Sequence, residues 1–237
     1  MGNSYFKFKQ FTVEQDACAM KVCTDACLFG AWVANTIKVL HVERMLDIGT
    51  GTGLLCLMVA QQYNVPIDAI EIDEAATLQA SENFKTSPWA YRLNVINADI
   101  RKLEPSKQYD FIFCNPPFFI NDLKSSGTQW NTALHSTHLS AEDLIKSIKR
   151  LLNSEGHFAL LLPPHRVNEY EQLANEAGLF IIKKVSVQQT EKHSTFRVML
   201  LFGTTHQTVE ESEIIIKEGG SYSTKFIELL KDYYLYL

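Results

Sequence analysis

A glycine-rich turn between a strand and a helix is the feature that most constrains how this chain can fold. Gly49, Gly51 and Gly53 stand between the mostly apolar stretch 45–48 and the apolar run 54–60. Glycine permits positive φ and lets the backbone come close to a ligand. A strand that leads through such a turn into a helix starts a βαβ unit of a parallel sheet. Strand and helix patterns alternate along the rest of the chain, so we expect an α/β fold.

The carboxylate of Asp47 narrows the choice of ligand for this turn. Asp47 lies two residues before Gly49. Dinucleotide-binding turns contain similar glycines, but a pyrophosphate at a helix N-terminus disfavours a neighbouring carboxylate. S-adenosylmethionine carries a sulfonium and an α-ammonium group, and both favour one. Asp47 therefore indicates S-adenosylmethionine rather than NAD.

Two more acidic residues are expected at the ends of the next two strands. Glu71 lies in the strand pattern 67–73, about 20 residues after the glycines, which is the spacing of the second strand of a βαβ unit. Its carboxylate can accept hydrogen bonds from both ribose hydroxyls. Asp99 ends the pattern 94–99 and can accept one from the adenine amine. Ligands of open α/β sheets bind at the carboxyl ends of the strands, where these side chains would meet.

Asn115, Pro116, Pro117 and Phe118 follow the apolar strand pattern 109–114. Two successive prolines cannot donate ladder hydrogen bonds, so the sheet must stop here. The residue before a proline is held extended, which places Asn115 at the strand tip. The Asn115 side-chain oxygen and the Pro116 carbonyl can each accept one N–H of an exocyclic NH2, while Phe118 stacks on the ring that carries it. We predict these four residues as the catalytic set.

Taken in order, these motifs resemble those of class I S-adenosylmethionine-dependent methyltransferases. The Asn-Pro-Pro-aromatic version resembles members that methylate adenine N6, guanine N2 or a glutamine side-chain amide. Both chain ends resemble bacterial tRNA(Val) adenine-N6 methyltransferases, which act on the adenine just 3′ of the anticodon. That resemblance lies in residues 8–11, 19–25, 30–32, 220–224 and 230–235. Two positions depart from the family pattern: Cys23 replaces a small residue, often Gly, and Phe118 replaces a frequent Tyr.

The resemblance implies a Rossmann-like, seven-stranded, mostly parallel sheet with its last strand antiparallel and helices on both faces. It implies one domain over residues 1–237, in which residues 1–40 form an N-terminal arm and helical extension that contribute to the cofactor and substrate sites. It also places three N-terminal residues beside the methionine end of the cofactor. The predicted cofactor-binding residues are Lys21, Thr24, Asp25, Asp47, Gly49, Gly51, Gly53, Glu71, Ile72, Asp99, Ile100 and Asn115.

Local patterns predict the remaining elements. Asp73 and Ser140 precede helical patterns as N-caps, and Gly178 ends one. The predicted helices cover residues 54–64, 74–85, 141–152, 166–177 and 224–235. The predicted later strands cover residues 157–162, 180–189 and 195–202, the last two as a hairpin-like pair.

A tRNA partner has to be reconciled with a net charge of −5. Local patches, rather than the total charge, steer nucleic acid to a protein. Lys7 and Lys9 alternate with aromatic residues, a pattern that suits phosphate contact and base stacking. Equally, these aromatic residues could anchor the N-terminal arm while the lysines are solvated. Residues 146–150 carry a second basic group. The predicted substrate-binding residues are Lys7, Lys9, Phe118, Phe119 and Trp130.

Composition limits the cellular setting. No segment reaches the apolar length of a membrane span, and the N-terminus lacks the apolar core of a secretion signal. Five cysteines without a Cys-x-x-Cys pair suggest reduced thiols. The spacing of Cys18, Cys23 and Cys27 fits no usual zinc pattern. We expect a cytoplasmic monomer without a metal.

Other functions stay open at this point. A protein glutamine methyltransferase would use the same Asn-Pro-Pro-aromatic chemistry, and an rRNA guanine-N2 methyltransferase would act on ribosomal RNA. From a different class, the chain could be a non-catalytic RNA-binding factor that kept the cofactor fold. The acidic strand ends and Asn115 disfavour lost catalysis, and Asp47 disfavours an NAD enzyme.

Overall fold

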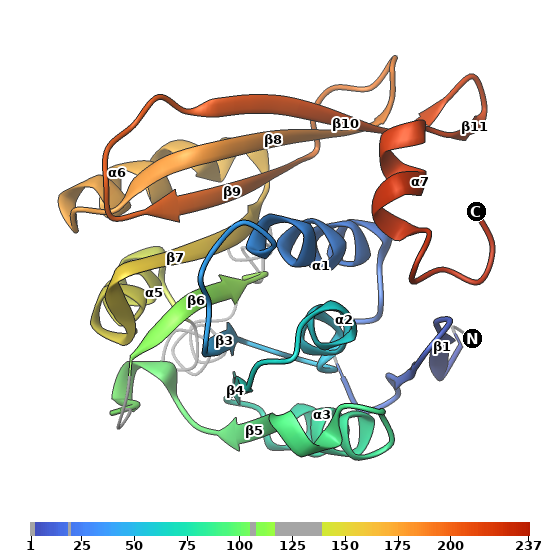
Figure 1. Cartoon of the computed structure of the whole chain (residues 1–237), viewed down its shortest axis with the longest axis horizontal. Helices are drawn as coiled ribbons and strands as arrows, with labels where there is room; N and C mark the ends of the chain where they lie inside the picture. Colours follow the sequence, from blue (N-terminus) through green and yellow to red (C-terminus); the bar gives the residue numbers. More distant parts are fainter. Residues whose placement is uncertain (1–2, 19, 105–107, 117–138) are drawn as a thin grey trace, which may run out of the picture.

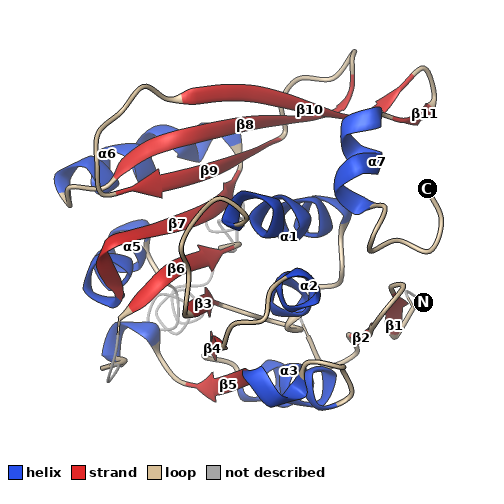
Figure 2. Ribbon diagram, viewed as in Figure 1, coloured by secondary structure: helices blue, strands red, loops and turns tan. Residues whose placement is uncertain are grey.

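A nine-stranded mixed sheet forms the centre of the computed structural model, which describes residues 3–18, 20–104, 108–116 and 139–237 (Figures 1 and 2). The strand order is β11-β10-β8-β9-β7-β6-β3-β4-β5. The parallel strands are β3 (Met45–Ile48), β4 (Ile67–Glu71), β5 (Leu93–Asn97), β6 (Tyr109–Cys114) and β7 (Leu152–Leu162). The other strands are β8 (Phe180–Thr190), β9 (Arg197–Gly203), β10 (Glu210–Glu218) and β11 (Ser221–Tyr222).

The predicted mostly parallel sheet is confirmed, and the predicted antiparallel strand is β9, which lies between β7 and β8. The strand number was wrong: β10 pairs parallel with β8, and β11 pairs antiparallel with β10, so the sheet has nine strands instead of seven. In β10, Ile214 and Ile216 are buried while four acidic residues are exposed. These charges hide the alternating apolar pattern by which a strand is recognised.

Helices cover both faces of the sheet. They are α1 (Thr24–Ile37), α2 (Leu54–Gln62), α3 (Glu74–Lys85), α5 (Ala141–Leu151), α6 (Val167–Glu176) and α7 (Thr224–Leu230), with short 3₁₀ helices η1 (Ala90–Arg92), η2 (Ile100–Lys102) and η3 (Pro164–Arg166). One apolar core joins the sheet to α1, α2, α3 and α7, and a second joins it to α5 and α6 (Figure 1). Among these helices we find none whose length and apolar content would let it span a bilayer.

Local signals explain where most helices begin and end. The side chains of Asp73 and Ser140 accept backbone N–H groups at the starts of α3 and α5, as predicted. Gly178 has φ 71° just after α6. Helix α7 ends at Leu230, five residues earlier than predicted. The chain leaves the helix there to bury Tyr233, whose hydroxyl donates to the Met58 carbonyl at 3.1 Å.

The N-terminal arm begins as a small hairpin of β1 (Tyr5–Lys7) and β2 (Thr12–Glu14). Phe8 and Phe11 are buried and stack with ring centroids 4.4 Å apart. The aromatic residues therefore anchor the arm on the domain. Lys7 and Lys9 remain exposed, and the Lys9 ammonium donates to the Lys231 carbonyl at 2.5 Å.

Candidate cofactor and methyl-transfer site

The glycine-rich turn is tied to the neighbouring strand β4. The amides of Gly49 and Thr50 both donate to the Ile70 carbonyl, at 2.8 and 3.1 Å. Gly49, Gly51 and Gly53 all have positive φ. A Cβ atom at Gly53 would lie 2.5 Å from the Phe84 ring, whereas one at Gly49 or Gly51 would meet no described atom within 4 Å. Helix α3 thus packs against the end of the turn, while the first two glycines border open space.

Asp47 is fully buried in β3, directly before this turn. Its Oδ2 accepts hydrogen bonds from the Thr50 hydroxyl at 2.7 Å and the Cys56 thiol at 3.3 Å. Its Oδ1 is buried and has no hydrogen-bond partner among the described residues. Burial raises the pKa of Asp47 to about 7, against the hydrogen bonds from Thr50 and Cys56 that lower it. A buried carboxylate oxygen without a partner fits the ammonium or sulfonium group of a cationic ligand.

Glu71 stands at the end of β4, beside the turn. Its Oε2 accepts the Gly51 amide at 2.9 Å, and its Oε1 accepts the amides of Ile72 and Asp73 at 2.9 and 3.0 Å. Backbone donors on both oxygens fix the carboxylate at the carboxyl edge of the sheet. Ile72 follows with an exposed apolar side chain. The Oε2 atom accepts a single amide and so keeps a lone pair for the predicted contact with a ribose hydroxyl, whereas Oε1 already accepts two amides.

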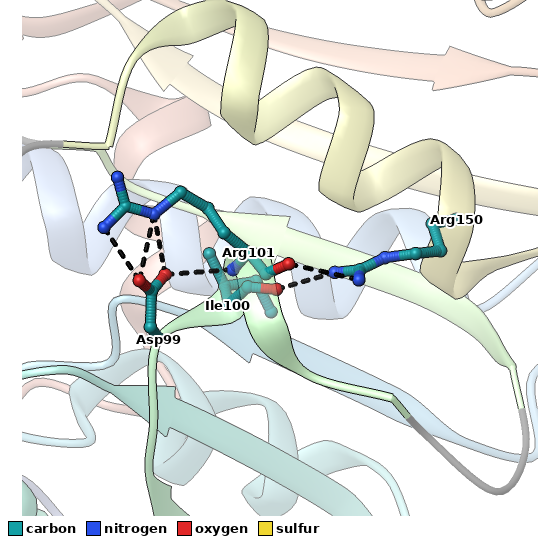
Figure 3. A network of polar contacts seen from close by, with 4 residues as sticks. All are labelled: Asp99, Ile100, Arg101 and Arg150. Atoms are coloured by element: carbon teal, nitrogen blue, oxygen red, sulfur yellow. Dashed lines mark hydrogen bonds and ion pairs between the residues drawn. The ribbon is translucent and has the colours of Figure 1, made fainter.

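Asp99 follows β5 and is held in a different way (Figure 3). Both of its oxygens accept from the Arg101 guanidinium, at 2.7 to 3.0 Å, and its Oδ1 also accepts the Arg101 amide. The bonds from Arg101 lower the pKa of Asp99 below its usual range. Arg150 in α5 donates to the carbonyls of Ile100 and Arg101, at 2.7 and 3.2 Å. The backbone that follows Asp99 is therefore held in place by a side chain of α5.

Asn115 comes directly after β6, where Cys114 pairs with Ile48 of β3. This register makes Asn115 and Gly49 the next residues of two adjacent parallel strands. The Asn115 Oδ1 is buried and has no partner among the described residues. Pro116 is buried beside it. Pro117, Phe118, Phe119 and Trp130 lie outside the described residues.

The predicted N-terminal cofactor residues contact other parts of the chain. Asp25, in the first turn of α1, accepts the Arg197 guanidinium at 2.8 Å and the Ala26 amide at 3.2 Å. Arg197 begins β9, whose next residue pairs with Leu162 at the end of β7. Lys21 is exposed and donates to the Asn3 carbonyl, and Thr24 is exposed at the start of α1. Their contacts with the cofactor stay predictions.

Several residues of the site were not predicted from the sequence. Thr50 and Cys56 contact the Asp47 carboxylate, Arg101 pairs with Asp99, and Asn83 bonds to the carbonyl of Thr52 within the glycine turn. Only Asn83 leaves a sequence signal, because it is a polar residue on the buried face of α3 beside Phe84. The other contacts depend on tertiary distances that the sequence does not display.

The geometry fits S-adenosylmethionine at the glycine turn and an amino group at Asn115. Asp47 offers a buried acceptor to a cation, the Glu71 Oε2 can accept from a hydroxyl, and open space lies beside Gly49 and Gly51. Asn115 offers a second unpartnered oxygen one strand away. These residues lie at the carboxyl edge of the parallel strands, where open α/β sheets bind their ligands.

Solved structures with this fold carry names that refer to different methyltransferase reactions. The chain superposes on a predicted O-methyltransferase from Agrobacterium tumefaciens with a TM-score of 0.66 at 17% identity, covering 88% of this chain and 96% of the other. It superposes on a ribosomal protein L11 methylase from Lactobacillus delbrueckii with a TM-score of 0.59 at 16% identity, covering 82% and 84%. At such identities the similarity establishes the class I methyltransferase fold alone.

Sequence comparison is more specific. Residues 30–199 match the family model described as Methyltransferase small domain. The chain is 42% identical over 241 residues to the tRNA1(Val) (adenine(37)-N6)-methyltransferase of Cytophaga hutchinsonii, with 100% of both chains covered. It is 41% identical over 239 residues to the enzyme of that name from Dyadobacter fermentans, with 98% of each covered. The family predicted from the motifs is thereby confirmed: this chain belongs to the tRNA1(Val) (adenine(37)-N6)-methyltransferase family.

Proposed function

We propose that this protein uses S-adenosylmethionine to methylate N6 of adenine 37 in tRNA(Val), next to the anticodon. Relatives with full-length similarity carry this activity in their names. The observation that carries the proposal within the site is the Asn115 Oδ1, a buried acceptor without a described partner beside the glycine turn. An exocyclic amine would satisfy it.

The chain's own groups prepare the amine for transfer. The lone pair of an adenine amine is delocalised into the ring, which makes the nitrogen a poor nucleophile. If the Asn115 Oδ1 and the Pro116 carbonyl each accept one N–H, the nitrogen shifts toward tetrahedral character and its lone pair is directed toward the methyl group. The same acceptors stabilise the positive charge that develops on the nitrogen. S-adenosylmethionine, when bound, supplies an activated methyl group, so no metal and no covalent enzyme nucleophile are needed.

The cofactor residues act by binding and orienting. Asp47 offers its unpartnered oxygen to a cationic group, Glu71 accepts from the ribose, and Asp99 accepts from the adenine amine of the cofactor. Ile72, exposed at the end of β4, provides an apolar face for the cofactor's adenine. Holding donor and acceptor in one geometry contributes much of the rate in such reactions.

The target base must leave its stack to reach a strand-edge pocket. An anticodon loop allows this at a lower cost than a duplex does. The exposed Lys7 and Lys9 are proposed to contact the RNA backbone. We further propose a monomer in the cytoplasm, where tRNA is modified.

One assay separates this function from its alternatives. The full-length protein is incubated with methyl-labelled S-adenosylmethionine, in one arm with total unmodified tRNA and in the other with total cell protein. Digested RNA is then analysed by mass spectrometry for the methylated nucleoside. N6-methyladenosine in the tRNA(Val) anticodon loop supports the proposal. Label in a polypeptide, or N2-methylguanosine in RNA, would overturn it in favour of the glutamine or guanine alternative.

A further inference from the structure

We propose that Asn83 is a positioning residue for the cofactor site, because it locks the N-terminal arm onto the glycine-rich turn. Asn83 lies in α3, outside all of the motifs, and only 1% of its surface is exposed. The inference rests on the proposed use of S-adenosylmethionine. It concerns how the turn is held before the cofactor arrives.

The amide of Asn83 makes hydrogen bonds to two segments that are distant in sequence. Its Nδ2 donates to the Thr52 carbonyl at 2.8 Å and to the Glu14 carbonyl at 2.9 Å. Its Oδ1 accepts the Glu14 amide at 2.9 Å. Both donor hydrogens and the acceptor are thus engaged. Glu14 ends β2 of the arm, and Thr52 lies between Gly51 and Gly53.

The residues of the arm that follow Glu14 lie near α3 and the carboxylate of Glu71. The Ala17 amide donates to the Gln79 side chain of α3 at 3.2 Å. Cys18 follows, and burial together with the charges of Glu71 and Asp73 raises the pKa of its thiol to about 11. The arm therefore lies within electrostatic reach of Glu71, the carboxylate assigned to the ribose.

Helix α3 contacts the turn through two successive residues. Phe84, next to Asn83, leaves no room for a Cβ atom at Gly53. Gly49, Gly51 and Gly53 all have positive φ, which is only one of the many conformations open to glycine in the unfolded chain. A bond to the Thr52 carbonyl fixes the middle of this flexible segment, so the amides and open space around Gly49 and Gly51 are preorganised.

Matched substitutions on α3 separate positioning from simple attachment of the arm. Asn83→Leu has a similar volume and removes the bonds to both the arm and the turn. Gln79→Leu removes a bond to the arm alone, from the same buried face one helical turn earlier. Where Asn83→Leu does not fold, Asn83→Asp keeps the acceptor for the Glu14 amide and loses the donors to both carbonyls.

The readouts are the cofactor Kd by calorimetry and hydrogen exchange of residues 49–54, neither of which requires RNA. We expect Asn83→Leu and Asn83→Asp to raise Kd about 10-fold or more and to speed exchange in the turn, because buried carbonyls lose their donors. Gln79→Leu should change Kd by less than about 3-fold. Equal increases in Kd for Gln79→Leu and the Asn83 variants, or unchanged Kd in the latter, would overturn the proposal. If the protein does not methylate tRNA but the variants still show these differences in Kd, the proposed substrate is wrong and the role of Asn83 is retained.

Discussion

Asp47 and Asp99 are the same residue type at the carboxyl edge of one sheet, yet the pKa values of their carboxyl groups are shifted in opposite directions. Asp47 is buried without a cation, and its pKa is raised to about 7. Asp99 is paired with the Arg101 guanidinium, and its pKa is lowered (Figure 3). The protein supplies the counter-charge of Asp99 itself. Among the described residues it supplies none for the unpartnered oxygen of Asp47, which is the position proposed for the cationic group of the cofactor.

The largest effect is expected from Asp47→Asn. Removing one member of a buried charge pair costs about 3–5 kcal/mol, so cofactor affinity measured by calorimetry should fall by that amount. At pH 8 the cofactor-free variant should resist denaturant better than the wild type, since it buries no charge. A Kd within a few-fold of the wild-type value would contradict the assignment of Asp47 to the cationic group.

Asp99→Ala should have a smaller effect on cofactor binding and the opposite effect on stability. Loss of this partly buried acceptor predicts about 1–3 kcal/mol weaker cofactor binding. The free energy of unfolding should also fall at neutral pH, because Asp99 loses its bonds to Arg101 and to the backbone of η2. Calorimetry and urea unfolding measure the two quantities. Unchanged cofactor affinity would remove Asp99 from the adenine contact.

The pH dependence separates the two carboxylates without mutation. Ionised Asp47 binds a cation, so affinity should rise with pH and level off above about 7; the expected gain from pH 6 to about pH 7.5 is about 8-fold. In the cofactor-free protein the sign reverses. A folded-state pKa raised from 3.8 to about 7 stabilises the fold below 3.8, and that stability is lost as the pH rises to about 7, by up to about 4 kcal/mol.

Asp99, with its lowered pKa, contributes stability above its unfolded-state pKa and loses it as the pH falls through the folded value.

The control for the Asp47 prediction is the variant Asp47→Asn. Its cofactor affinity and its stability should both depend less on pH than those of the wild type between pH 4 and about 7. Parallel profiles for the two proteins would show that another group titrates in this range.

The smallest effect on cofactor affinity is expected at Arg150, which holds the backbone after Asp99. Arg150→Lys cannot bond to both the Ile100 and Arg101 carbonyls in the same way, and we expect about 3-fold weaker cofactor binding. Glu104→Gln is the matched control, because it removes only the exposed ion pair of Arg150. Equal Kd values for both variants would mean that Arg150 does not position Asp99.

The sequence predicted the end of β6 correctly and the ends of β4 and β5 to within two residues, because apolar runs, glycines and prolines act locally. Residues 54–60, Asp73 and Asn115 lie where those signals place them. It did not predict which carboxylate would lack a partner. Asp47 and Asp99 look alike in the chain, and their difference comes from burial and from the folding of Arg101 back onto Asp99.

Long-range hydrogen bonds account for the other differences between the sequence predictions and the structure. Arg150 was grouped with Lys146 and Lys149 as basic residues, but its guanidinium bonds to carbonyls about 50 residues earlier in the chain. The lock at Asn83 joins residues 69 and 31 positions away. β10 was missed because exposed acids interrupt its apolar alternation. Each of these is a tertiary effect that outweighs local propensity.

The most direct test removes one of the two unpartnered oxygens of the site. It removes Asn115 Oδ1 and leaves Asp47 Oδ1 in place. For Asn115→Ala, cofactor Kd and the single-turnover rate of methyl transfer to unmodified tRNA(Val) are measured together. We expect a rate lower by about 10³-fold with a nearly unchanged Kd, since this oxygen acts on the acceptor amine and not on the cofactor's charge. Near-normal transfer in the variant would contradict the assignment of Asn115 to the target amino group.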